Sequence, residues 1–114
     1  MICLLACAGG NSTHEAPEIL SAEYSRNVLA VTTSDPDSNG GMIYAEWYMW
    51  QFDGYDHWES NTYKYLQTED IETHSFLAHK LYGYEWLVVL QAEDDNGRAS
   101  NIYLLYADAS EKTR

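Results

Sequence analysis

The chain has 114 residues, of which 46% are hydrophobic and 14% aromatic, so it is long and apolar enough to fold around its own core. Its 18 acidic and 6 basic residues give a formal net charge of −12, which repels phosphate backbones and anionic lipid surfaces. Nucleic acid and the membrane surface are therefore disfavoured as partners, whereas cations and proteins with a basic patch fit the charge.

Residues 1–16 change abruptly from apolar to small and polar. The run Leu4-Leu5-Ala6-Cys7 resembles a bacterial lipobox, in which the cysteine becomes the lipidated first residue of the mature protein. We therefore expect 1–16 to be a truncated signal and flexible tether, with a lipid anchor on Cys7. The alternative is an ordinary apolar terminus, because no basic segment precedes the apolar stretch. Since Cys3 and Cys7 both lie here, no disulfide is expected in the core.

Residues 17–107 predict an all-β domain, and 108–114 a polar tail. Alternating apolar residues and turn formers predict strands over 17–24, 28–34, 42–52 and 73–78, with only a short edge strand over 63–66 in the uncertain segment 53–70. Leu29, Val31 and Thr33 are expected to face inward. In 42–52, Glu46 marks the solvated face, so Trp47 on the other face is the predicted core residue.

The stretch over residues 81–106 predicts two long strands joined by an acidic turn. One face of its first strand is apolar throughout: Trp86, Val88, Leu90 and Ala92. Asn96-Gly97 is the strongest short signal for a two-residue hairpin, because both central residues must tolerate positive φ. After that turn we expect Ile102, Leu104 and Tyr106 to face the same core.

About seven antiparallel strands with turns every ~8–12 residues, and no significant helix, predict an immunoglobulin-like β-sandwich. Three motifs carry a resemblance to a family: Asp35-Pro36-Asp37, then Tyr44 with Trp47, then Asp94-Asp95-Asn96-Gly97. In this order they resemble the PKD family and related bacterial Ig-like modules, over roughly residues 17–107, and residues 81–92 also resemble a fibronectin type III corner. The resemblance implies a spacer or binding domain of an exported protein in the bacterial cell envelope, either lipid-anchored or secreted.

Acidic residues cluster in two of the predicted loops. Loops after the second and sixth strands of an Ig-like sandwich lie at the same end, which would bring Asp35, Asp37, Asp94 and Asp95 together, with Asn39 nearby. Converging carboxylates repel one another, and a hard cation such as Ca²⁺ relieves this through oxygen ligands. These residues are the candidate metal site. The alternative is turn chemistry, in which each aspartate accepts hydrogen bonds from its own loop.

Ten tyrosines and four tryptophans exceed what one small core needs. Tyr44, Tyr48 and Trp50 share the solvated face of the strand 42–52 and form a candidate binding face for a protein or glycan partner. Four more rings follow nearby: Tyr55, Trp58, Tyr63 and Tyr65. The alternative is that this face packs on itself through cross-strand pairs, or is buried by residues 53–70.

No catalytic apparatus is recognisable. The histidines are scattered along the chain, so we expect surface histidines and no zinc site: His14, His57, His74 and His79. No Gly-x-Ser-x-Gly motif or glycine-rich phosphate loop is present, and we predict that the protein is not an enzyme. The expected function is a cell-surface module that binds a protein or acts as a spacer. The alternatives are a carbohydrate-binding module and a small cytosolic domain, and only a lipid on Cys7 would bring it to a membrane.

Overall fold

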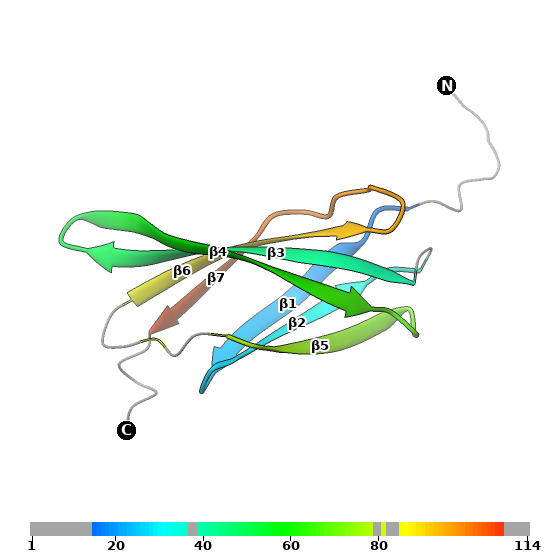
Figure 1. Ribbon diagram of the computed structural model, residues 1–114, viewed down its shortest axis with the longest axis horizontal. Coiled ribbons are helices and arrows are strands. Elements are labelled where there is room, and N and C mark those ends of the chain that lie inside the picture. Colours follow the sequence, from blue (N-terminus) through cyan, green and yellow to red (C-terminus); the bar gives the residue numbers. More distant parts are fainter. Residues whose placement is uncertain (1–14, 37–38, 79–80, 82–84, 109–114) are drawn as a thin grey trace.

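The structure is a computed structural model, and it describes residues 15–36, 39–78, 81 and 85–108 (Figure 1). The described part contains seven strands: β1 (Glu18–Ser25), β2 (Val28–Ser34), β3 (Gly40–Gln51), β4 (Gly54–Leu66), β5 (Ile71–Leu77), β6 (Glu85–Asp94) and β7 (Tyr103–Asp108). It contains no helix, and therefore none that could cross a membrane. The prediction of an all-β fold is confirmed.

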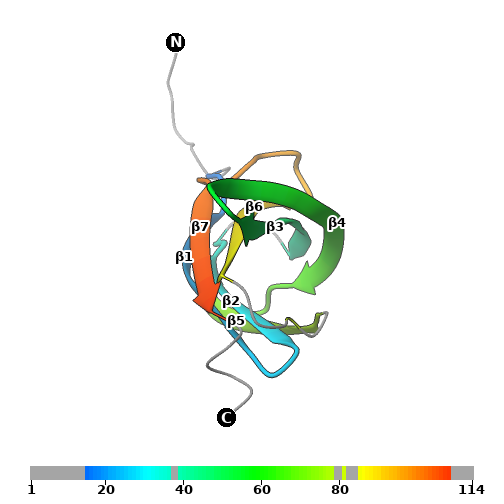
Figure 2. The same ribbon diagram turned by 90° about the vertical axis from the view of Figure 1, so that its left-hand side faces the viewer.

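The strands form two antiparallel sheets that pack face to face as an immunoglobulin-like β-sandwich (Figures 1 and 2). The three-stranded sheet has the order β1-β2-β5, and the four-stranded sheet has the order β4-β3-β6-β7. β1 lies beside β7 at one edge of the sandwich. There the Asn101 side chain accepts a hydrogen bond from the N–H of Ile19 at 2.8 Å and donates one to the carbonyl oxygen of Ile19 at 3.2 Å. The edge strands β4 and β5 lie on the other side of the sandwich.

The core lies between the sheets and is lined by the residues that the alternation predicts. Leu29, Val31 and Thr33 of β2 are buried, and so is the whole predicted face of β6: Trp86, Val88, Leu90 and Ala92. Trp47 of β3 is buried as well, with its ring edge-on to that of Tyr24 at a centroid distance of 6.1 Å. Burying one large apolar side chain contributes about 1.5–3 kcal/mol, so these facing residues hold the two sheets together.

The loop from β6 to β7 differs from the predicted two-residue turn. The carbonyl oxygen of Asp94 accepts the N–H of Gly97 at 3.0 Å, and Asp94 donates its own N–H to Arg98 at the same distance. Gly97 has a φ of 82°, but Asn96 has no positive φ. The pattern is therefore a tight turn closed by a glycine bulge.

This loop also decides which face of β7 packs against the core, and the observed face is the opposite of the predicted one. Glu93 pairs with Ala99, but Leu90 pairs with Tyr103, so the returning chain has one residue more than the matching stretch of β6. A shift of one residue moves every side chain to the other face of the sheet. The prediction for Ile102, Leu104 and Tyr106 is wrong, because all three are exposed. The residues of β7 that pack against the core are Tyr103, Leu105 and Ala107.

The largest correction concerns residues 53–70. In place of a short edge strand over 63–66, residues 54–66 form β4, which pairs with β3 along its whole length. Trp47 pairs with Glu59 but Tyr48 pairs with His57, so Trp58 forms a bulge and interrupts the alternation. The predicted strands over 17–24, 28–34, 42–52 and 73–78 begin and end within two residues of the observed ones.

Candidate functional site

The β3–β4 hairpin extends past the rest of the four-stranded sheet at one end of the molecule (Figure 1). The strand β6 pairs with β3 only as far as Met49, so Trp50 and the turn beyond it have a neighbour on β4 alone. Phe52, in that turn, is 96% exposed. Behind it, the rings of Trp50 and Tyr55 meet edge to face with their centroids 5.1 Å apart. Aromatic side chains therefore gather at the tip of the hairpin.

The backbone at the tip is strained. Gln51 pairs with Gly54, which leaves Phe52 and Asp53 as the two central residues of the turn, and only Phe52 has a positive φ, of 57°. When only the first central residue of such a turn has a positive φ, that residue is usually glycine. A side chain in this region costs about 1–2 kcal/mol, and an exposed ring offsets none of that cost by burial.

The three residues of the predicted binding face lie on the side of β3 away from the core. Tyr44 and Trp50 are exposed and Tyr48 is half-buried, and residues 53–70 do not cover them because β4 lies beside β3 in the same sheet. The hydroxyl of Tyr44 donates to Glu93 at 3.0 Å, and this hydrogen bond raises the pKa of Tyr44. The ring of Tyr48 stands edge-on to His57 at a centroid distance of 5.2 Å. Tyr48, like Trp50, has a neighbouring ring packed against it, which reduces the ring surface open to a ligand.

A pocket of about 160 Å³ lies at the same end of the sheet, lined by Tyr55, Glu85, Trp86, Tyr106 and Ala107. The strands β4 and β7 are opposite edges of the sheet, yet the ring centroids of Tyr55 and Tyr106 are 6.5 Å apart. Figure 2, which faces this end, shows the β3–β4 hairpin curving across it toward β7. Desolvation and then the negative charge of Glu85, which lines the same pocket, raise the pKa of Tyr55.

Sequence reasoning missed this pocket. Its walls come from three strands that meet only because the sheet curves, and the alternation places Tyr106 in the core. The one available signal is the excess of rings, since Tyr55 and Trp58 stand among the aromatic residues that the core does not need. Nothing in the local pattern singles out Glu85.

The two acidic loops do meet, at the opposite end of β6 from the pocket. The N–H of Asp95 donates to the carbonyl oxygen of Gly40 at 2.9 Å. Asp35 is 1% exposed, and its Oδ2 accepts the hydroxyl of Tyr65 at 2.9 Å. The pKa of Tyr65 is raised by desolvation, then by the hydrogen bond and charge of Asp35, and further by the charges of Asp94 and Asp95. The two loops are therefore neighbours, and the charges of all three aspartates act on the same tyrosine.

The structure favours turn chemistry for Asp94. Its Oδ1 accepts the backbone N–H of Asn96 at 2.9 Å and of Arg98 at 2.8 Å, as an aspartate that closes its own loop does. Among the described residues, no three His, Cys, Asp or Glu side chains are placed to hold a metal ion. Asp37 lies outside the described residues, so the calcium site of four aspartates stays a prediction.

One histidine is buried, contrary to the expectation of surface histidines. His74 of β5 is buried, with its Nε2 2.9 Å from Oε1 of Gln67 and 3.0 Å from Oγ1 of Thr33. The hydroxyl of Thr33 also donates to Oε1 of Gln67, at 2.7 Å. Desolvation lowers the pKa of His74, because burial penalises the charged ring. His57 is exposed, as expected, and His14 and His79 lie outside the described residues.

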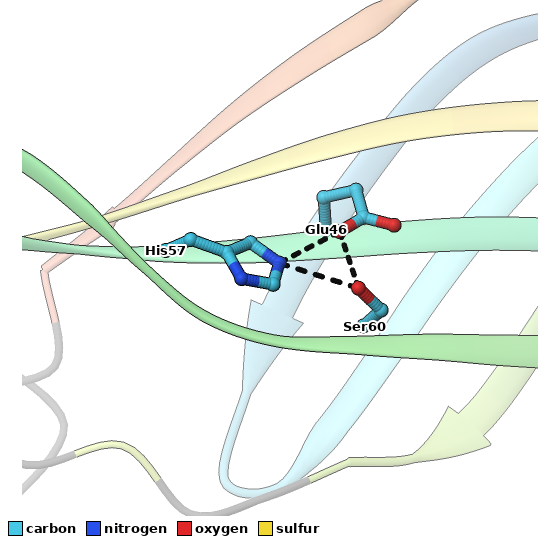
Figure 3. Close-up of polar contacts among 3 residues, drawn as sticks. All are labelled: Glu46, His57 and Ser60. Atoms are coloured by element: carbon cyan, nitrogen blue, oxygen red, sulfur yellow. Dashed lines mark hydrogen bonds and ion pairs between the residues drawn. The ribbon is translucent and has the colours of Figure 1, made fainter.

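Glu46 of β3 and two residues of β4, His57 and Ser60, form a polar cluster on the exposed side of the sheet (Figure 3). Oε1 of Glu46 lies 2.7 Å from Nε2 of His57, and Oγ of Ser60 lies 3.2 Å from the same nitrogen. Ser60 also donates to Glu46 at 2.5 Å, and this hydrogen bond lowers the pKa of Glu46. A catalytic triad needs the acid on Nδ1 and the serine on Nε2. Here both partners contact one nitrogen, so the cluster is not arranged as a proton relay.

Comparison with known proteins found no family model that matches the sequence and no match among curated proteins. The immunoglobulin-like sandwich therefore rests on the observed strands and their pairing. The likeness to PKD modules stays a prediction. So does lipidation at Cys7, which lies outside the described residues.

Proposed function

We propose that the protein is a non-catalytic module of the bacterial cell surface that binds a protein partner through the aromatic end of its β3–β4 hairpin. The observation that carries the proposal is Phe52. It occupies a turn position that glycine would fill without strain, and its ring is 96% exposed. Strained residues that the fold itself does not require are concentrated at functional sites.

The surroundings of Phe52 fit a protein interface. Trp50, Trp58 and Tyr106 are exposed as well, and aromatic residues dominate the energetic centres of protein interfaces. The net charge of −12, with Asp53 in the turn and Asp56 close to it, favours a partner that presents basic side chains. The lipobox-like sequence at Cys7 and the likeness to PKD modules support the cell-surface location.

Three observations favour a protein over the alternative carbohydrate ligand. Stacking on a sugar needs an open ring face, whereas Tyr48 and Trp50 each have a neighbouring ring packed against them. Phe52, the most exposed ring in the described part of the chain, has no polar group to hydrogen-bond a sugar. The strong negative charge attracts a basic partner but adds nothing to the binding of a neutral sugar.

The test compares capture of proteins from a bacterial envelope extract by immobilised wild-type protein and two variants. Phe52→Gly removes the ring, and Leu77→Ser is the matched control, because Leu77 is 81% exposed but lies on β5. A specific partner should bind the control as well as wild type, and bind Phe52→Gly at least about 10-fold more weakly, as a central interface aromatic does. Equal capture by wild type and Phe52→Gly would contradict the proposal. Binding to a glycan array that depends on Trp50 would instead support the carbohydrate alternative.

A further inference from the structure

The pocket at the hairpin end combines three aromatic rings with one carboxylate. Tyr55, Trp86 and Tyr106 supply the rings, and Glu85 supplies the carboxylate. The face of an aromatic ring is electron-rich and attracts a cation within about 6 Å of the ring centroid, most strongly for tryptophan. The centroids of Tyr55 and Tyr106 are 6.5 Å apart with the rings tilted by 55°, so a group that lies beside both rings can be within that reach of each centroid.

Trp86 gives the pocket a fixed wall. It is 4% exposed, and the ring of Trp58 stands edge-on to it at a centroid distance of 5.8 Å and an angle of 89°. A ring held in this way does not need to be ordered when a ligand binds, which lowers the cost of binding. The indole N–H of Trp86 is buried and has no hydrogen-bond partner in the structure, an unusual state for a buried donor.

The size and lining of the pocket select among cations. A cavity of about 150 Å³ takes a ligand of the size of benzene, and a trimethylammonium group belongs to the same size class. The pocket here measures about 160 Å³, and its rings and Ala107 offer contact surface to methyl groups. A bare ammonium group donates three hydrogen bonds and prefers charged oxygen acceptors, and Glu85 is the one carboxylate in the lining. The lining therefore suits a cation whose charge is spread over methyl groups.

We infer that the pocket formed by Tyr55, Glu85, Trp86, Tyr106 and Ala107 binds a trimethylammonium group by cation–π contacts, with Glu85 supplying the counter-charge. The net charge of −12 raises the local concentration of such cations. The group can belong to a small molecule such as choline or to a trimethylated lysine side chain, because both present the same chemistry. The inference rests on the proposed function, since the pocket adjoins the hairpin that is proposed to contact the partner.

The decisive test compares choline with 3,3-dimethyl-1-butanol, which has a carbon atom in place of the charged nitrogen and otherwise the same shape. Each is titrated into the ¹⁵N-labelled protein, and the indole N–H signal of Trp86 is followed. Choline should shift this signal and bind about 5- to 30-fold more tightly than the neutral analogue, as expected for cation–π contacts of about 1–2 kcal/mol. Equal binding of the two compounds, or no shift at Trp86, would overturn the inference.

Matched variants assign the effect to the pocket. Tyr106→Leu keeps an apolar side chain but removes the ring, and Tyr106 is 63% exposed, so the fold should be retained. We expect choline to bind Tyr106→Leu about 10-fold more weakly. Tyr44→Leu removes an exposed ring of the same sheet outside the pocket and should bind choline as wild type does. If Tyr106→Leu binds choline unchanged, the pocket is not the site.

The source of the cation follows from a second titration with the Nα-acetyl amide of trimethyllysine. Binding at least as tight as that of choline indicates a side chain of a protein partner, and markedly weaker binding indicates a small molecule. The outcome for the pocket is separable from the outcome for the hairpin. If Phe52→Gly loses the captured partner while choline fails to shift Trp86, this inference is wrong and the proposed function stands.

Discussion

The substitution Tyr65→Phe removes one buried hydroxyl and leaves the ring in place. That hydroxyl donates to Oδ2 of Asp35 at 2.9 Å, and the Asp35 side chain has almost no contact with water. A hydrogen bond to a charged group contributes about 1.5–3 kcal/mol, because its loss leaves a desolvated oxygen without that donor. We therefore expect the free energy of unfolding of Tyr65→Phe to fall by about 2–3 kcal/mol.

The matched control is Tyr44→Phe, whose lost hydroxyl also donates to a carboxylate. The Tyr44–Glu93 distance is 3.0 Å, but the pair is exposed, so water replaces the donor and the loss should be clearly smaller than that of Tyr65→Phe. Urea unfolding followed by tryptophan fluorescence measures both variants. With an m-value of about 2 kcal/mol/M, the midpoint of Tyr65→Phe should fall by about 1 M. Equal losses in the two variants would refute the reasoning that burial decides the contribution.

Three further predictions concern pH, packing and calcium. Because the pKa of His74 is lowered in the folded protein, the neutral ring stabilises the fold fully above about pH 6.5. This stabilisation is lost as the pH falls, because the unfolded chain takes up the proton first. The urea midpoint should therefore change less between pH 8 and 5 in His74→Gln than in wild type, and equal slopes would contradict this. An added Cβ at Gly41 collides with the carbonyl oxygen of Glu93, so Gly41→Ala should lower the free energy of unfolding by about 1–3 kcal/mol. Gly54 has open space around it, so Gly54→Ala should lower it clearly less. The reverse order of the two variants in urea unfolding would contradict this packing. Because Asp94 closes its own turn, thermal melts in calcium and in EDTA should superimpose, whereas a rise of several degrees that Asp37→Ala abolishes would establish the cation site.

The alternation of apolar and polar residues predicts most of the sandwich because burial on one face leaves a direct trace in the sequence. Every second residue of 86–92 is apolar, and each of these four side chains is buried. The same holds for Leu29, Val31 and Thr33 in β2. The convergence of the two acidic loops was also predictable, because the sandwich topology places both at one end.

The remaining features depend on single residues or on curvature. The bulge at Trp58 breaks the alternation that would have revealed β4. One extra residue between Ala99 and Tyr103 decides which face of β7 is buried, and no periodicity within β7 records it. The pocket needs Tyr55 and Tyr106 to meet from opposite edges of a curved sheet, which local sequence patterns do not encode.

The claim that the hairpin end serves binding is tested most directly by measuring two properties of Phe52→Gly. The substitution removes a solvent-exposed ring and relieves a positive φ, so the free energy of unfolding should stay the same or rise by up to about 1 kcal/mol. Capture of the partner should be lost in the same variant. A clear loss of stability would show that Phe52 serves the fold, and undiminished capture would show that it does not serve binding, and either result would contradict the account.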